Sequence, residues 1–192
     1  TIIEPHCRIA QLDEDMLALG ESGKPCLAYS CMKRFGFVLD PTQEKVQNWL
    51  YALFDRYADM GFKYFKLDFL AQTIKAPHFH DDSVPKGKII RKIIEPIYDA
   101  VKGRAAILGC NYTFEAGTAY VDDVRVSGDI HASWKNVKSN VVSVANRFWS
   151  NERFWRNDPD FALCRGYETS DDPDLNRLKP GLVYITPEAP AS

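Results

Sequence analysis

The chain has 192 residues, of which 45% are hydrophobic and 26% are charged, and this is the composition of an ordinary globular protein with a sizeable core. Its formal net charge of -2 gives no reason to expect a nucleic acid or an anionic membrane surface as a partner. No apolar run approaches the roughly 18 residues of a transmembrane candidate, so no membrane segment is expected.

The first part of the chain predicts a strand, a long connection and a helix. Ile2-Ile3 precedes Glu4-Pro5, which indicates a strand end because the residue before a proline avoids the helical region. A short strand is expected inside the connection, near 25–30. Apolar residues then recur at three- and four-residue spacing from 43 to 60, which predicts a helix that Gly61 ends.

The next segment, residues 62–69, is an aromatic-rich strand that the pattern predicts to be covered on both faces of a parallel sheet. Alternation along the strand points Lys66 and Asp68 to the same side. A carboxylate and an ammonium are therefore expected at its C-terminal end, where parallel α/β folds keep their chemistry. A buried salt bridge without a catalytic role is the alternative for this pair.

The remaining predicted elements are a helix over 85–102, strands near 105–110 and 121–127, a helix marked by apolar residues from 137 to 148, and a strand near 155–164. Pro96 lies inside the first of these helices and should kink it or remove one backbone hydrogen bond. The strand at 121–127 again carries a cation and a carboxylate toward its end, Arg125 and Asp129. Two carboxylates from two strand ends are the equipment of a glycosidase.

This alternation of strands and helices predicts an α/β fold. Five strands are expected, the first near residues 1–4 and the others as given above. A closed eight-stranded barrel usually needs about 250 residues, so we expect part of a (β/α)8 TIM barrel, roughly its strands 3 to 7. Residues 1–192 are expected to be a fragment of such a catalytic barrel, without a second domain.

The cysteines give a weak indication of the compartment. The five of them are scattered and form no Cys-x-x-Cys pair (Cys7, Cys26, Cys31, Cys110 and Cys164). This pattern favours free thiols in a reducing compartment such as the cytoplasm. The localisation itself stays open, because the chain begins abruptly at Thr1 without an initiator methionine and its start is expected to be missing.

Several short motifs together resemble a known family. They are Ile3-Glu4-Pro5, Leu39-Asp40-Pro41-Thr42, Lys66-Leu67-Asp68-Phe69, Cys110, Arg125-Val126-Ser127-Gly128-Asp129 and Trp155-Arg156-Asn157-Asp158-Pro159-Asp160. Their order and rough spacing are similar to those of the α-galactosidase (melibiase) group, in the clan of retaining (β/α)8-barrel glycoside hydrolases that includes families 27 and 36. The resemblance runs from about Thr1 to Arg165.

This resemblance implies roles for the matching residues. Asp68 matches the catalytic nucleophile of a double-displacement mechanism, and Asp129 matches its general acid/base. Lys66 and Arg125 match residues that hydrogen-bond sugar hydroxyls beside those carboxylates. Cys110 ends the intervening strand, at a position where the family often lines the sugar pocket.

Two further residues are candidates for sugar binding. Trp134, just past Asp129, could stack on a sugar face, and it is preferred to Trp149, which helical spacing places in the core. Asp158 could belong to the pocket, with a structural cap as the alternative.

The implied function is hydrolysis of carbohydrates with a terminal α-galactosyl group, without a metal or another cofactor. Transfer of the sugar to another carbohydrate is one alternative. A catalytically incomplete sugar-binding barrel fragment is another, because the first barrel strands are not in this chain. An oligomeric parent enzyme stays open. The segment His78-Phe79-His80-Asp81-Asp82, with His6, could bind a metal, but a solvated loop is the preferred interpretation.

Overall fold

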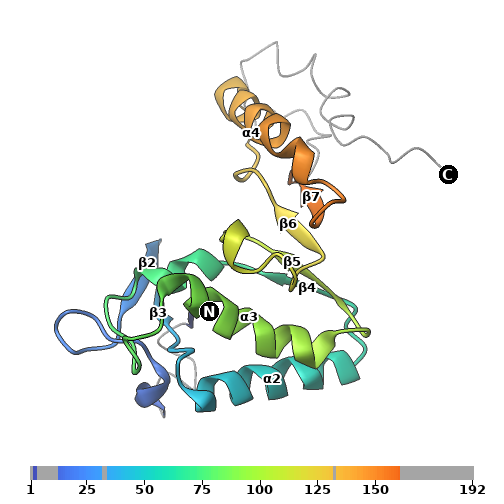
Figure 1. The fold of residues 1–192 in the computed structure, drawn as a ribbon. Helices are drawn as coiled ribbons and strands as arrows, with labels where there is room; N and C mark the ends of the chain where they lie inside the picture. The colour runs from blue at the N-terminus through green and yellow to red at the C-terminus, as the bar shows by residue number, and fades with distance from the viewer. Residues whose placement is uncertain (1, 4–12, 32–33, 132, 161–192) are drawn as a thin grey trace. The chain divides into compact units, whose positions relative to one another are not determined.

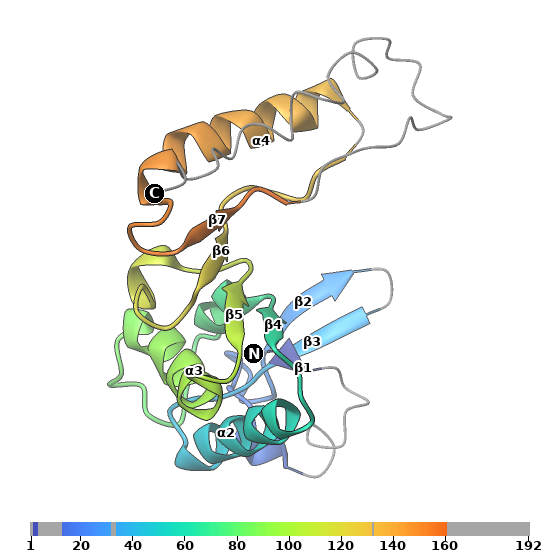
Figure 2. The ribbon, with the colours of Figure 1, turned by 90° about the vertical axis from the view of Figure 1, so that its right-hand side faces the viewer.

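A computed structural model describes residues 2–3, 13–31, 34–131 and 133–160 of the chain (Figures 1 and 2). The chain divides into two compact units, Thr1–Asp122 and Asp123–Ser192. The expectation that all of residues 1–192 belong to one barrel fragment without a second domain stays a prediction.

The first unit begins with an antiparallel sheet of β1 (Ile2–Ile3), β2 (Leu27–Cys31) and β3 (Arg34–Val38), in the order β1-β3-β2. The strands expected near 1–4 and 25–30 are therefore present. However, β1 pairs antiparallel with β3, with Ile2 opposite Val38, so its expected place among the parallel strands is wrong. The partner of β1 could not be predicted, because pairing between distant segments leaves no local sequence pattern. In addition, the partner strand β3 was not itself predicted.

Two helices of the first unit pack against each other, α2 (Glu44–Asp59) and α3 (Lys86–Val101). Figure 1 shows them side by side. Both match their predicted ranges, and Gly61 follows α2 with a φ of 95° that favours glycine. The apolar side chains of α3 are buried, namely Ile89, Ile90, Ile93, Ile94, Ile97, Ala100 and Val101. Burying an isoleucine contributes roughly 1.5–3 kcal/mol, so this face holds the helix even though Pro96 lies inside it.

The strands β4 (Tyr64–Leu67) and β5 (Ala106–Gly109) pair in parallel, with Leu67 opposite Gly109. This confirms the predicted parallel pairing for these two strands and the helix-to-strand order around them. The residues that follow, Asp68 and Cys110, consequently leave the sheet at the same edge. The short 3-10 helices of this unit are η1 (Glu14–Met16), η2 (Leu70–Lys75) and η3 (Phe114–Ala116).

Only one face of β4 is covered by the described residues. Phe65 packs edge-on against Phe54 of α2, with ring centroids 5.3 Å apart, and Leu67 is buried. Tyr64 is 51% exposed, and Lys66 and Asp68 are exposed as well. The expectation that both faces are covered is therefore wrong for β4, because the described residues cover only the side that faces α2.

The second unit contains β6 (Asp123–Arg125), α4 (Trp134–Arg147), η4 (Phe148–Ser150) and β7 (Arg156–Asp158). β6 and β7 pair in parallel, and the buried Asp123 binds Arg156 directly across the pair at 2.6 Å. The expected strand near 155–164 is thus present at its start, while residues from 161 onward lie outside the described residues.

One core prediction in the second unit is wrong. Trp149, expected in the core by helical spacing, is 60% exposed. The α-helical period ends at Arg147, and Trp149 lies in the 3-10 turn that follows, where the angular spacing of side chains is different. The neighbouring Trp155 is buried instead.

The parallel pairs and the helices between the strands confirm the predicted α/β class. Within the described ranges, no helix combines the length and the apolar character needed to cross a membrane.

Candidate functional site

Asp68 lies at a sharp turn directly after β4. Its Oδ1 accepts a hydrogen bond of 2.7 Å from the N–H of Phe69. Phe69 has a φ of 58°, in the left-handed region that a bulky aromatic residue rarely adopts. Such a conformation costs of order 1–3 kcal/mol and tends to occur at active sites and ligand clamps. The exposed Asp68 carboxylate is therefore presented by a strained strand end.

The end of β5 repeats this arrangement beside it. Cys110 donates its N–H to the carbonyl of Leu67 at 2.8 Å, and Asn111 after it has a φ of 47°. The carbonyl of Asn111 accepts the N–H of Ala71 at 2.7 Å, which ties the two loops together. The Cys110 side chain is buried, and its role at a sugar stays a prediction.

Lys66 lies in β4, two residues before Asp68. Both side chains are exposed, and the described residues contain no ion pair between them. The buried salt bridge considered as an alternative is thus not formed. Both groups are accessible to solvent, and the part of Lys66 in sugar binding stays a prediction.

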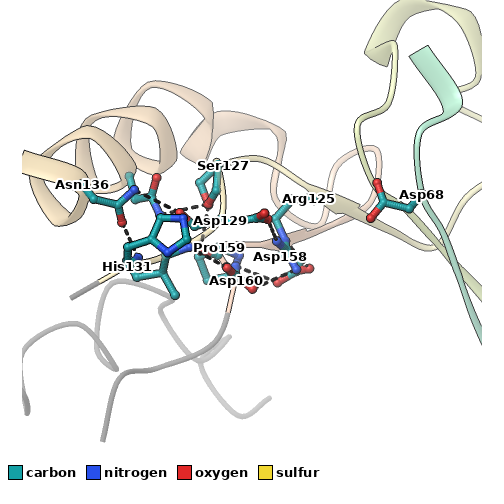
Figure 3. Close-up of polar contacts among 12 residues, drawn as sticks. Asp68, Arg125, Ser127, Asp129, His131, Asn136, Asp158, Pro159 and Asp160 are labelled. Atoms are coloured by element: carbon teal, nitrogen blue, oxygen red, sulfur yellow. Dashed lines mark hydrogen bonds and ion pairs between the residues drawn. The ribbon is translucent and has the colours of Figure 1, made fainter. Parts of the chain in front are cut away.

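Arg125, at the end of β6, is the centre of the polar cluster in the second unit (Figure 3). Its side chain is 8% exposed, and it pairs with three carboxylates. Nε donates to Asp158 Oδ2 at 2.8 Å, Nη2 pairs with Asp160 Oδ1 at 2.9 Å, and Nη1 donates to Asp129 Oδ1 at 3.3 Å. A buried guanidinium needs such partners, since an unpaired buried charge is strongly destabilising.

The three carboxylates differ sharply in their access to solvent. The side chain of Asp129 is 79% exposed, that of Asp158 is 24% exposed, and that of Asp160 is 7% exposed. Asp129 is therefore the most accessible of the three carboxylates to a bound molecule. Asp158 uses one oxygen for Arg125 and the other to accept the N–H of Asp160 at 2.8 Å, which is the structural alternative expected for it. Its part in a sugar pocket stays a prediction.

Two asparagines of α4 hold the backbone around Asp129. Asn140 donates to the carbonyl of Gly128 at 2.9 Å, and Asn136 donates to the carbonyl of Asp129 at 3.0 Å. The side-chain carbonyl of Asn136 also accepts the N–H of His131. The segment that carries Asp129 is thus fixed from the helix that follows it (Figure 3).

Asn136, Asn140 and Asp160 were not among the predicted site residues. One signal was available, because Asn140 lies between Val137 and Val144 on the buried face of α4. A polar side chain on such a face needs a partner. Another signal was the second aspartate of the Asn157-Asp158-Pro159-Asp160 motif, but its partners on a distant segment could not be identified from spacing.

Trp134 is the first residue of α4 and is 46% exposed. The helix is capped by Ser133, whose side chain accepts the N–H of Asn136 at 3.3 Å. An exposed indole at a helix start is available for stacking, and that role stays a prediction for Trp134.

The loop with two histidines, residues 78–82, is held by hydrogen bonds that involve carboxylates and backbone groups. His78 contacts Asp82 at 3.2 Å and Glu21 at 3.4 Å, and the hydrogen bonds with Asp82 and then Glu21 raise the pKa of His78. The buried Asp40 accepts hydrogen bonds from Thr42 and from the N–H of His80. Among the described residues, no three His, Cys, Asp or Glu side chains are grouped for a metal, and His6 lies outside those residues.

Comparisons with known proteins identify solved structures with a similar fold. No family model matches the chain. The alpha-galactosidase TtGalA from Thermus thermophilus, in complex with stachyose, has a TM-score of 0.77 at 24% identity, over 96% of this chain and 42% of that chain. Its complex with p-nitrophenyl alpha-D-galactopyranoside gives 0.78 at 23% identity, over 96% and 40%.

These likenesses confirm the predicted fold, which is part of a (β/α)8 barrel. The chain spans about two fifths of the length of the solved chains that it matches.

Proposed function

We propose that this chain carries the two catalytic carboxylates of a retaining glycoside hydrolase that acts on α-galactosides. The main support is the fold, which over 96% of the chain is similar to a protein solved with stachyose and with an aryl α-galactoside. Asp68 follows a strand of a parallel pair, and Asp129 follows another shortly after its end. Barrel enzymes carry their catalytic groups at this end of their strands.

In the proposed first step, the Asp68 carboxylate attacks the anomeric carbon while the bond to the leaving oxygen breaks. Asp129 gives its proton to that oxygen, so the products are a free alcohol and a galactosyl ester of Asp68. In the second step, Asp129 takes a proton from water, and the water oxygen displaces Asp68 from the anomeric carbon. Two inversions give galactose with the original α configuration.

The remaining predicted residues are proposed to bind the sugar. The ammonium of Lys66, two residues before Asp68, is a donor for sugar hydroxyls. Arg125 and Asp158 are proposed to meet the sugar near Asp129. Cys110 and Trp134 are proposed to line the pocket as a small thiol and an aromatic stacking surface.

Hydrolysis and transfer use the same carboxylates and differ in the acceptor, which is water or a sugar hydroxyl. The test is to incubate the whole protein with p-nitrophenyl α-galactoside and stachyose and to measure nitrophenol, free galactose and oligosaccharides. With p-nitrophenyl α-galactoside as the sole substrate, hydrolysis predicts equal amounts of nitrophenol and galactose, and with either substrate the α anomer of galactose appears first by NMR. Galactose in deficit, with longer oligosaccharides, would instead show transfer. Binding of galactose without any turnover would favour the sugar-binding alternative.

A further inference from the structure

We infer that Asp160 is a positioning residue that fixes the carboxylate of Asp129 through Arg125 and through the backbone that follows Asp129. Its kinetic consequence rests on the proposed function, whereas the positioning itself is a property of the second unit. Asp160 need not touch a substrate for this role, and its 7% exposed side chain fits an anchor better than a sugar ligand.

A single carboxylate makes both contacts. Oδ1 of Asp160 pairs with Nη2 of Arg125 at 2.9 Å, and Oδ2 accepts the N–H of Ile130 at 2.7 Å. Ile130 is the residue directly after Asp129. Asp160 therefore holds the backbone next to Asp129 and also the guanidinium that contacts the Asp129 side chain.

The planar guanidinium transmits this constraint to Asp129. Asp158 contacts Nε of Arg125 and Asp160 contacts Nη2, and these two contacts fix the plane of the guanidinium group. The remaining terminal nitrogen, Nη1, then contacts Asp129 Oδ1 at 3.3 Å. Because the Asp129 side chain is 79% exposed, this contact is what restricts its rotamer.

The backbone at Asp160 also selects the residue type. Its φ is 75°, in the left-handed region, and its N–H is satisfied by Asp158 Oδ1 at 2.8 Å. Aspartate and asparagine tolerate this region better than other residues with side chains. Of these two, aspartate supplies the negative charge for Arg125, so the position needs both the conformation and the charge.

The test uses two variants and a matched control. Asp160→Asn keeps the left-handed tolerance and an oxygen acceptor for the Ile130 N–H but loses the charge, while Asp160→Ala loses both contacts. Glu152→Gln is the control, since Glu152 is an exposed acid of the same unit with a φ of 58°. Melting curves verify that each variant is folded, and Asp160→Asn serves as the decisive variant if Asp160→Ala does not fold.

NMR measures the positioning without any substrate. In Asp160→Ala, exchange of the Ile130 amide proton is expected to accelerate roughly tenfold, since its hydrogen bond is lost. In Asp160→Asn, the Ile130 amide stays protected while the Arg125 Nε–H signal shifts. Glu152→Gln changes neither signal. An unchanged Arg125 signal in folded Asp160→Asn would overturn the inference.

Kinetics then separate a positioning role from a general structural one. A misplaced acid slows the departure of a poor leaving group more than that of nitrophenol, which needs less protonation. In Asp160→Asn, kcat/KM for stachyose should fall about tenfold to a hundredfold, and it should fall clearly less for p-nitrophenyl α-galactoside. Equal losses on both substrates would contradict positioning of the acid. A wild-type protein without activity would overturn the proposed function alone, because the NMR result still decides the positioning.

Discussion

At the scale of single residues, the two candidate carboxylates are exposed but are held in different ways. Within the described residues, the side chain of Asp68 accepts a hydrogen bond from the backbone N–H of Phe69, and Phe69 has a strained backbone conformation. Asp129 contacts the guanidinium of Arg125, which is itself buried among carboxylates. The orientation of Asp68 is thus set by its own strand end, whereas that of Asp129 is set by a neighbouring side chain.

The first prediction concerns the nucleophile. Asp68→Asn should lower α-galactoside hydrolysis by several orders of magnitude, because an amide cannot form the galactosyl ester. Added azide should not restore normal hydrolysis, and any product formed with it should be a glycosyl azide. Steady-state assays with p-nitrophenyl α-galactoside measure the loss, and Asp99→Asn on the exposed side of α3 is the control. Near-normal turnover of Asp68→Asn would remove Asp68 as the nucleophile.

The second prediction concerns His78, whose pKa is raised chiefly by its hydrogen bond with Asp82. A raised pKa means that this histidine stabilises the fold fully below its unfolded pKa of about 6.5 and that the contribution is lost as pH rises through the folded pKa. Asp82→Asn should lower the His78 pKa toward its ordinary value.

NMR titration of the His78 ring measures this shift directly. Glu21→Gln is the comparison, and it should lower the pKa less, because the hydrogen bond with Glu21 is the smaller cause. A His78 pKa that is the same in wild type and in Asp82→Asn would show that the ion pair is not formed in solution.

At the scale of elements, the helices were predictable because their buried faces follow a local period. α3 shows this best, since its isoleucines repeat at helical spacing and are all buried. The antiparallel partner of β1 could not be predicted, because pairing between distant segments leaves no local signal. Asp68 and Asp129 could be predicted because each is a polar residue that follows a predicted strand. The contacts of Asp160 with Arg125 and Ile130 could not be predicted, because they join segments that are distant in the sequence.

The third prediction concerns the loop after β5. Tyr112 is buried against Gly117, and a Cβ on Gly117 would lie 1.5 Å from the Tyr112 hydroxyl and 2.6 Å from Cζ. Gly117→Ala must therefore displace the tyrosine ring and should lower the free energy of unfolding by about 1–3 kcal/mol. Denaturant unfolding monitored by circular dichroism measures this change.

Gly87→Ala is the matched control for that substitution. Gly87 lies in α3 with no atom within 4 Å of an added Cβ, so alanine should raise the free energy of unfolding by about 0.4–1 kcal/mol. Opposite signs for the two glycines are expected. A Gly117→Ala protein as stable as the wild type would mean that Tyr112 does not occupy this position.

At the scale of the whole molecule, the proposed mechanism sets a distance between the two carboxyl groups. A retaining enzyme needs them about 5–5.5 Å apart, and an inverting enzyme needs about 6.5–9.5 Å to admit a water. Because the proposed mechanism is retaining, we predict a separation of about 5–5.5 Å in a crystal structure of the whole Asp68→Asn protein with p-nitrophenyl α-galactoside. The distance is a property of the whole molecule, since Asp68 belongs to the first unit and Asp129 to the second. A separation well beyond about 10 Å would exclude the two-carboxylate mechanism.

If Asp68 is the nucleophile, it forms a covalent ester with galactose, and this ester can be trapped. The whole protein is treated with a 2-deoxy-2-fluoro-α-galactosyl donor that bears a good leaving group, digested, and analysed by peptide mass spectrometry. We expect one adduct, on Asp68, whose slow release restores activity toward p-nitrophenyl α-galactoside. An adduct on another carboxylate, or turnover that releases β-galactose first and leaves Asp68 unmodified, would contradict this expectation.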